Sequence, residues 1–149
     1  MNIFVLHKSP IVSAIVLARV DPRRGRKIFL ECVQMMATAI RLRGIDLEAM
    51  PITKAGNYYR MTHANHPVCK WVRECSDNFR WTWTYAATLG EMLGLNGDNT
   101  NRLWKATGQF PRKASSGFTN CTPYKDAPSV YEAYEAHLME KWHNDEVSI

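Results

Sequence analysis

Apolar residues recur at helical spacing along most of the chain, and clear start and stop signals divide them into segments. Ser9-Pro10 and Asp21-Pro22 each place a capping side chain directly before a proline suited to the first helical position. They predict one helix over about 10–19 and a second over about 22–43. Gly44 follows the second helix where a left-handed residue commonly ends one.

The remaining segments complete a mainly helical pattern. Residues 2–7 are apolar and β-prone, which predicts a short extended segment at the start of the chain. With Asn65 as the expected cap, a third helix is predicted over 67–93. Shorter helices are expected over about 99–107 and 129–143, separated by a loop. The chain of 149 residues is therefore predicted to be all-α, with about five helices in a single compact domain spanning 1–149.

Composition narrows the possible functions. The net charge is +5 and the pI about 9.1, which suits a phosphate-bearing partner such as DNA or a nucleotide. No apolar run is long enough for a membrane span, so no membrane partner is expected. Walker, dinucleotide-binding and nucleophile-elbow motifs are absent from the sequence, which disfavours those enzyme classes. No cofactor is expected, and the oligomeric state stays open.

A polar stripe on the predicted helix 22–43 carries the most informative chemistry. Arg24, Lys27, Glu31, Gln34 and Thr38 are three or four residues apart, so they share one face among apolar neighbours. Glu31 and Gln34 should then face the interior or a cleft. A carboxylate in such a place must be paired, hydrogen-bonded or shifted in pKa, and is a candidate general base or electrostatic stabiliser. The alternative is a structural ion pair between Glu31 and Lys27.

Basic residues gather at the start of the same helix, where they oppose the helix dipole. A bound phosphate would offset that cost and use the free backbone N–H groups, whereas an ordinary solvated basic turn is the alternative. A late cationic loop that could touch a nucleic-acid backbone, or simply be solvated, contributes a further lysine. The candidate phosphate-binding residues are Arg19, Arg23, Arg24, Arg26, Arg73 and Lys113.

A second polar cluster surrounds the start of the predicted helix 67–93. One of its two histidines is expected to help cap or pack the helix start, and the other to donate to a ligand or phosphate. No cysteine or acid stands at a diagnostic spacing from them, so no metal site is predicted. The candidate residues for a base pocket are Gln34, His63, Asn65, Trp71 and Asn78, with His66 as a candidate catalytic group.

Four stretches together point to a family. Residues 1–6, 27–39, 62–79 and 118–134, with their Glu-x-x-Gln and His-Pro motifs, are similar to small phage proteins labelled pyrimidine-dimer DNA glycosylase, endonuclease V type. The likeness touches most of the chain. It implies a small helical DNA-binding protein of the host cytoplasm.

The resemblance also implies a reaction. Glycosylases of this type use an N-terminal α-amine as nucleophile, a helix glutamate and nearby arginines, so it assigns catalytic roles to the α-amine of Met1 and to Glu31, with Lys27 and His66 beside them. The expected function is DNA glycosylase and AP-lyase chemistry on damaged or modified pyrimidines. The alternatives are transfer to, or hydrolysis of, a modified nucleotide without a lyase step, and a non-enzymatic protein that binds DNA or another protein.

Overall fold

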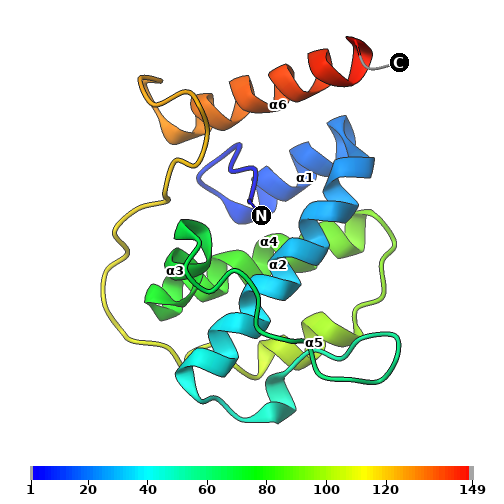
Figure 1. Cartoon of the computed structure of the whole chain (residues 1–149), viewed down its shortest axis with the longest axis vertical. Helices are drawn as coiled ribbons and strands as arrows, with labels where there is room; N and C mark the ends of the chain where they lie inside the picture. Colours follow the sequence, from blue (N-terminus) through cyan, green and yellow to red (C-terminus); the bar gives the residue numbers. More distant parts are fainter. Residues whose placement is uncertain (1, 148–149) are drawn as a thin grey trace.

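The computed structural model describes residues 2–147, and within them the protein is all-α (Figure 1). This confirms the predicted fold class. The α-helices of this part of the chain, with the short 3₁₀ helix η1 between the second and third, are α1 (Pro10–Val20), α2 (Pro22–Arg43), η1 (Leu47–Ala49), α3 (Pro67–Glu74), α4 (Ser76–Met92), α5 (Asp98–Trp104) and α6 (Val130–Val147).

The first two helices begin and end where the sequence predicts. The hydroxyl of Ser9 accepts a hydrogen bond from the backbone N–H of Val12, and a carboxylate oxygen of Asp21 accepts one from the N–H of Arg24. Each bond satisfies one of the N–H groups that a helix start leaves without an intrahelical partner. Gly44 ends α2 in the left-handed region, at a φ of 65°.

The predicted helix over 67–93 is in fact two helices, α3 and α4. Cys75 between them is extended, with φ −155° and ψ 165°. Long-range contacts impose the break. The backbone N–H of Ser76 donates to the carbonyl of Pro111 at 2.9 Å, and its hydroxyl donates to the carbonyl of Phe110 at 2.8 Å. These partners lie more than thirty residues away, which is why local periodicity does not show the break.

The cap of α3 also differs from the prediction. The expected cap, Asn65, is exposed, and His66 takes its place. The ring nitrogen Nδ1 of His66 accepts a hydrogen bond from the N–H of Val68 at 3.1 Å. The general expectation that one of the histidines caps this helix is therefore confirmed.

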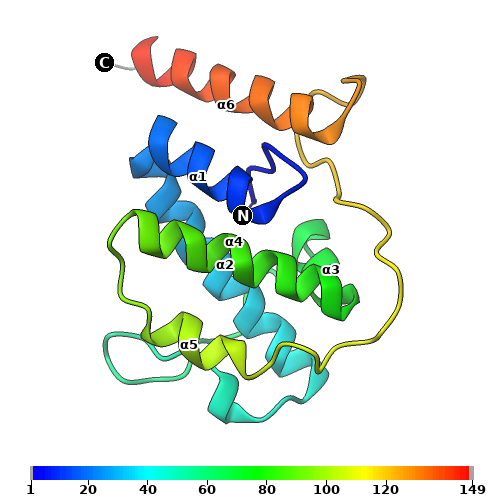
Figure 2. The same ribbon diagram turned by 180° about the vertical axis from the view of Figure 1, so that it is seen from behind.

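The last helix is longer than predicted and lies across the start of α2. It extends to Val147 instead of about residue 143. The indole N–H of Trp142 donates to Asp21 at 2.8 Å, and Asp145 accepts from Arg24 at 3.1 Å, so tertiary contacts support the additional turn. Figures 1 and 2 show α6 at one end of the molecule, away from α5.

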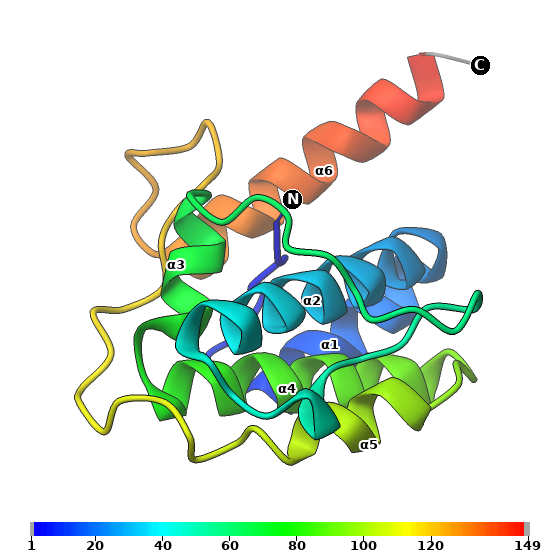
Figure 3. The same cartoon turned by 60° about the horizontal axis from the view of Figure 1, so that its bottom comes forward.

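The core lies around α2 and α4. Met35, Met36 and Ile40 of α2 and Tyr85 of α4 are fully buried. The extended N-terminal segment runs into this core and is held by its carbonyl at Phe4, which accepts hydrogen bonds from the hydroxyls of Ser13 and Tyr85, both at 3.1 Å. Figure 3 shows this segment entering between α6 and α2. Among helices within 2–147, none combines the length and apolar character needed to cross a membrane.

Candidate functional site

An open cleft of about 340 Å³ lies where the N-terminal segment meets α2 and α6. We call it the N-terminal cleft, and its lining residues are Asn2, Phe4, Arg24, Lys27, Ile28, Glu31, His66, Cys121, His137 and Lys141. The structure thus brings together three of the predicted catalytic residues, Lys27, Glu31 and His66. The fourth, Met1, lies outside the described residues.

Glu31 joins α2 to the extended segment. Its oxygen Oε2 accepts a hydrogen bond from the backbone N–H of Asn2 at 3.2 Å. The side chain of Asn2 in turn accepts from the hydroxyl of Tyr134 on α6 at 2.8 Å. The N–H of Asn2 therefore orients the carboxylate of Glu31, and Tyr134 holds Asn2 in position. Such support from neighbouring groups preorganises a polar side chain.

The structure shows no ion pair between Lys27 and Glu31. Between side chains of the described range 2–147, the ion pairs are those of Arg24 with Asp21 and Asp145. Lys27 is exposed on the rim of the cleft. Its ammonium is accordingly placed to meet a ligand that enters from solvent.

His66 faces the cleft as a neutral donor. Because Nδ1 accepts the capping hydrogen bond, the ring proton is assigned to Nε2. Burial lowers the pKa of His66, the nearby charge of His63 lowers it further, and Glu31 opposes both effects. The neutral form, which has a single N–H to donate, is thus favoured near neutral pH.

The sequence reasoning missed the contribution of α6. His137 and Lys141 stand one turn apart on the face that lines the cleft. The ring of His137 stacks on Phe4 at 5.8 Å, and its Nδ1 is buried without a hydrogen-bond partner among residues 2–147. Burial lowers the pKa of His137, and Lys141 lowers it further. The spacing of Tyr134, His137 and Lys141 on one helical face is the signal that could have found them.

Arg24 reaches the cleft but already has partners. Its guanidinium donates to Asp21 at 2.6 Å and to Asp145 at 3.1 Å. Burial alone would lower its pKa, but the hydrogen bonds to the two carboxylates raise it. Arg24 therefore connects α6 to the start of α2, and a phosphate would have to compete with two carboxylates for it.

The other candidate phosphate-binding residues are dispersed. Arg19 is exposed on α1, and Arg23 lies beside Asp21 and Asp145, next to the cleft. Arg26 lines a different groove on α2. The carbonyl of Arg73 accepts from Arg43, and Lys113 is exposed on the loop beside Ser76. The basic run therefore does not form one phosphate site.

None of the residues predicted for a base pocket lines the N-terminal cleft. Trp71 is buried against Phe118, with ring centroids 4.8 Å apart. Asn78 is buried and donates to the carbonyl of Trp71 at 2.8 Å, which supports the break between α3 and α4. His63 is exposed, with its Nδ1 2.7 Å from the hydroxyl of Thr62. Asn65 is exposed as well, and Gln34 is partly buried on α2.

Within the described residues, no cluster of three or more histidine, cysteine or acidic side chains is placed to hold a metal ion. Comparison of the chain with protein-family models, curated proteins and solved structures finds no match.

Proposed function

We propose that this protein is a DNA-acting enzyme that performs DNA glycosylase and AP-lyase chemistry on damaged or modified pyrimidines in the N-terminal cleft. One observation carries the proposal: the carboxylate of Glu31 and the amines of Lys27 and Lys141 converge on one open cleft beside the start of the chain. The likeness to phage pyrimidine-dimer glycosylases supports it and supplies the reaction.

The residues of the cleft suit each step of that reaction. An amine nitrogen bonds to C1′ of the sugar while the bond between C1′ and the base breaks, and the electrons of that bond leave with the base. Glu31 stabilises the positive charge that develops on the sugar. The N–H at Nε2 of the neutral His66 is placed to donate a hydrogen bond to the departing base. The sugar ring then opens, its ring oxygen takes up a proton, and the nitrogen becomes bonded to C1′ as a protonated imine. Removal of a proton from C2′ breaks the C3′–O bond, and the phosphate leaves with the electrons of that bond, which cleaves the strand.

Three amines compete for the role of nucleophile. The α-amine of Met1 stays a prediction from the resemblance. Lys27 and Lys141 are the two lysines that line the cleft. An amine in this position attacks only as its neutral form, so a neighbouring carboxylate that accepts a proton assists it.

The size of the cleft sets a condition on the substrate. A volume of about 340 Å³ suits one nucleotide unit, not a stacked duplex segment. The target nucleotide must therefore leave the base stack, and lesions that weaken stacking or pairing lower the cost of that step.

Borohydride trapping tests the proposal. Sodium borohydride reduces an imine to a stable secondary amine, so incubation with duplex DNA that holds an abasic site or a pyrimidine dimer should yield a covalent complex. Peptide mapping of that complex by mass spectrometry identifies the attacking amine among Met1, Lys27 and Lys141. Absence of both a trapped complex and strand cleavage overturns the proposal.

The same assay separates the alternatives. Turnover of free modified nucleotides without a trapped complex would favour nucleotide transfer or hydrolysis in the same cleft. Binding to DNA with neither activity would favour a purely binding protein.

A further inference from the structure

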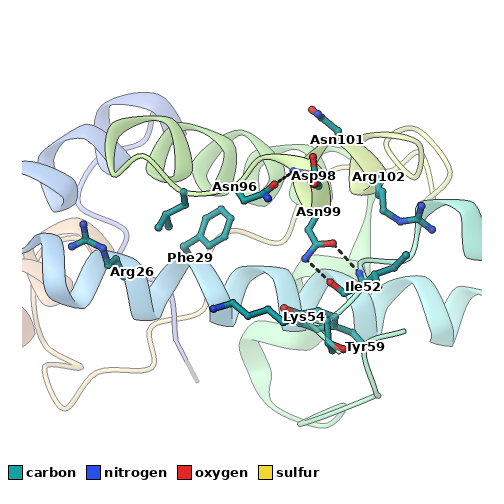
Figure 4. Close-up of a pocket in the computed structure, with 12 residues that line it drawn as sticks. Arg26, Phe29, Ile52, Lys54, Tyr59, Asn96, Asp98, Asn99, Asn101 and Arg102 are labelled. Atoms are coloured by element: carbon teal, nitrogen blue, oxygen red, sulfur yellow. Dashed lines mark hydrogen bonds between the residues drawn. The ribbon is translucent and has the colours of Figure 1, made fainter. Parts of the chain in front are cut away.

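A larger groove, of about 820 Å³, lies on another face of α2. Its walls come from α2, from the loop after η1 and from α5 with the turn before it (Figure 4). We call it the α2–α5 groove, and the residues that matter here are Arg26, Phe29, Lys54, Tyr59, Asn99 and Arg102.

The groove is separate from the N-terminal cleft. Arg26 and Phe29 line the groove, whereas Lys27 and Glu31 line the cleft. Successive residues of an α-helix point about 100° apart, so neighbours on α2 diverge to different sides. No lining residue is common to the two sites.

Positive charge dominates the groove. Arg26, Lys54 and Arg102 line it against one acid, Asp98. Arg26 and Lys54 are exposed, and Figure 4 shows the ammonium of Lys54 extending along α2 toward Phe29. Arg102 is fixed in place, since its guanidinium donates to the carbonyl of Met50 at 2.7 Å. This balance of charges favours an anionic ligand.

Two aromatic rings lie in the same groove. Phe29 packs against α4 at Gly90, where an added Cβ would stand only 2.9 Å from its ring. The glycine therefore lets one side of the ring rest on α4 while Phe29 still lines the groove. Tyr59 lies on the facing loop (Figure 4), and burial raises the pKa of its phenol.

The loop that carries Lys54 and Tyr59 is held in place. The side chain of Asn99 accepts from the backbone N–H of Ile52 at 2.8 Å and donates to its carbonyl at 3.0 Å. Ile52 also pairs with Tyr58 across a short bridge. These contacts fix the wall of the groove before any ligand arrives, which lowers the entropy lost on binding.

We propose that the α2–α5 groove binds a single strand of nucleic acid, with phosphates at Arg26 and Lys54 and one base against each of Phe29 and Tyr59. Cationic side chains that follow a backbone, interleaved with aromatic faces for bases, are the combination that single strands use. A duplex keeps its base faces stacked, so it cannot use the rings. The binding does not depend on the chemistry proposed for the cleft.

Fluorescence anisotropy with a labelled oligothymidylate of about 15 nucleotides tests whether Arg26 and Lys54 contact phosphates. For single strands, the logarithm of the association constant falls linearly with the logarithm of the salt concentration. The magnitude of this slope is about 0.7 for each phosphate that the protein contacts. The double substitution Arg26→Gln with Lys54→Gln should reduce the magnitude of this slope by about 1.4, and should weaken binding about tenfold or more at low salt. The double substitution Lys70→Gln with Lys105→Gln removes two exposed lysines outside the groove and is the matched control.

A second pair of variants tests the rings. Tyr59→Leu should weaken binding about tenfold, within the range measured for loss of one stacked base, and leave the salt slope unchanged. Tyr59→Phe keeps the ring and should bind as the unaltered protein does. Thermal melts check that each variant is folded.

Three results would overturn the proposal. They are no binding of the oligothymidylate by the unaltered protein, an unchanged salt slope in the double variant, and competition by thymidine monophosphate as strong as that by the oligomer. The last result would indicate a mononucleotide site. None of them depends on whether borohydride traps a covalent complex.

Discussion

Basic side chains lie on both the cleft side and the groove side of α2, but the two sides differ in how far hydrogen bonds hold these and neighbouring polar side chains in place. On the cleft side, Arg24 donates to Asp145 of α6, Glu31 accepts from the N–H of Asn2, and His66 caps α3. On the groove side, Arg26 and Lys54 are exposed beside aromatic rings. Glu31 and His66, which hydrogen bonds already orient, suit a reaction, whereas the exposed Arg26 and Lys54 suit a long, flexible anion. The basic run of the sequence is thus divided between the cleft and the groove, because a helix turns consecutive residues apart.

The cleft and the groove differ most in the role of α6. This helix forms one wall of the cleft and no part of the groove. Asp21 caps α2, pairs with Arg24 and accepts from Trp142 of α6. Asp21→Ala should therefore lower the free energy of unfolding by about 2–4 kcal/mol, from the lost cap and side-chain hydrogen bonds. Urea unfolding measures the change.

Hydrogen exchange locates the effect of Asp21→Ala. Amides of α6 should exchange faster, and those of α5 should not. Asp126→Ala removes an exposed acid elsewhere and should change stability little. Equal loss of protection in α5 and α6 would show that Asp21 supports the whole fold and not the cleft wall.

The groove depends on the close packing of Phe29 on Gly90. Gly90→Ala places a Cβ 2.9 Å from the ring, so the ring must shift. We expect a loss of stability of about 1–3 kcal/mol, as for other overpacked sites. Gly97→Ala is the control for added volume, because its Cβ meets its nearest neighbour at 3.7 Å, and as the cap of α5 it should lose no more than about 1 kcal/mol. Equal urea midpoints for the two variants would contradict the packing described.

The cleft histidines should make stability depend on pH. Folding lowers the pKa of His66 and His137, chiefly through burial, below the unfolded value of 6.5. Below pH 6.5 the unfolded chain therefore binds protons first, so stability is full above that pH and falls as the pH drops toward the folded pKa values.

His66→Asn isolates one part of this effect. Asparagine also caps helices well, so α3 should persist. The variant should lose less stability than the unaltered protein between pH 7.5 and pH 5.5, as measured by urea unfolding at both values. If the variant and the unaltered protein lose the same free energy of unfolding between these two pH values, groups other than His66 cause the pH dependence.

The sequence predicts well what nearby residues decide. The starts of α1 and α2 follow from Ser9 and Asp21, and the spacing of the polar stripe puts Lys27 and Glu31 on the side of α2 that lines the cleft, although Gln34 does not line it. Both features depend on residues within one or two helical turns.

Features decided by distant partners escape such reasoning. The break at Cys75 needs Phe110 and Pro111, and the cleft needs His137 and Lys141 from the last helix. The placement of Trp71 and Asn78 in packing, away from the cleft, likewise depends on side chains that approach from elsewhere in the chain. The spacing of apolar and polar residues along the sequence does not predict these contacts.

Borohydride trapping of an abasic-site duplex by Glu31→Gln tests the reactive role of the cleft most directly. The amide oxygen of glutamine can still accept from the N–H of Asn2, so the fold should persist while the charge is lost. We expect the rate of adduct formation to fall about 100-fold or more, with Glu132→Gln, an exposed acid on α6, unaffected. Adduct formation by folded Glu31→Gln at the rate of the unaltered protein would contradict the account.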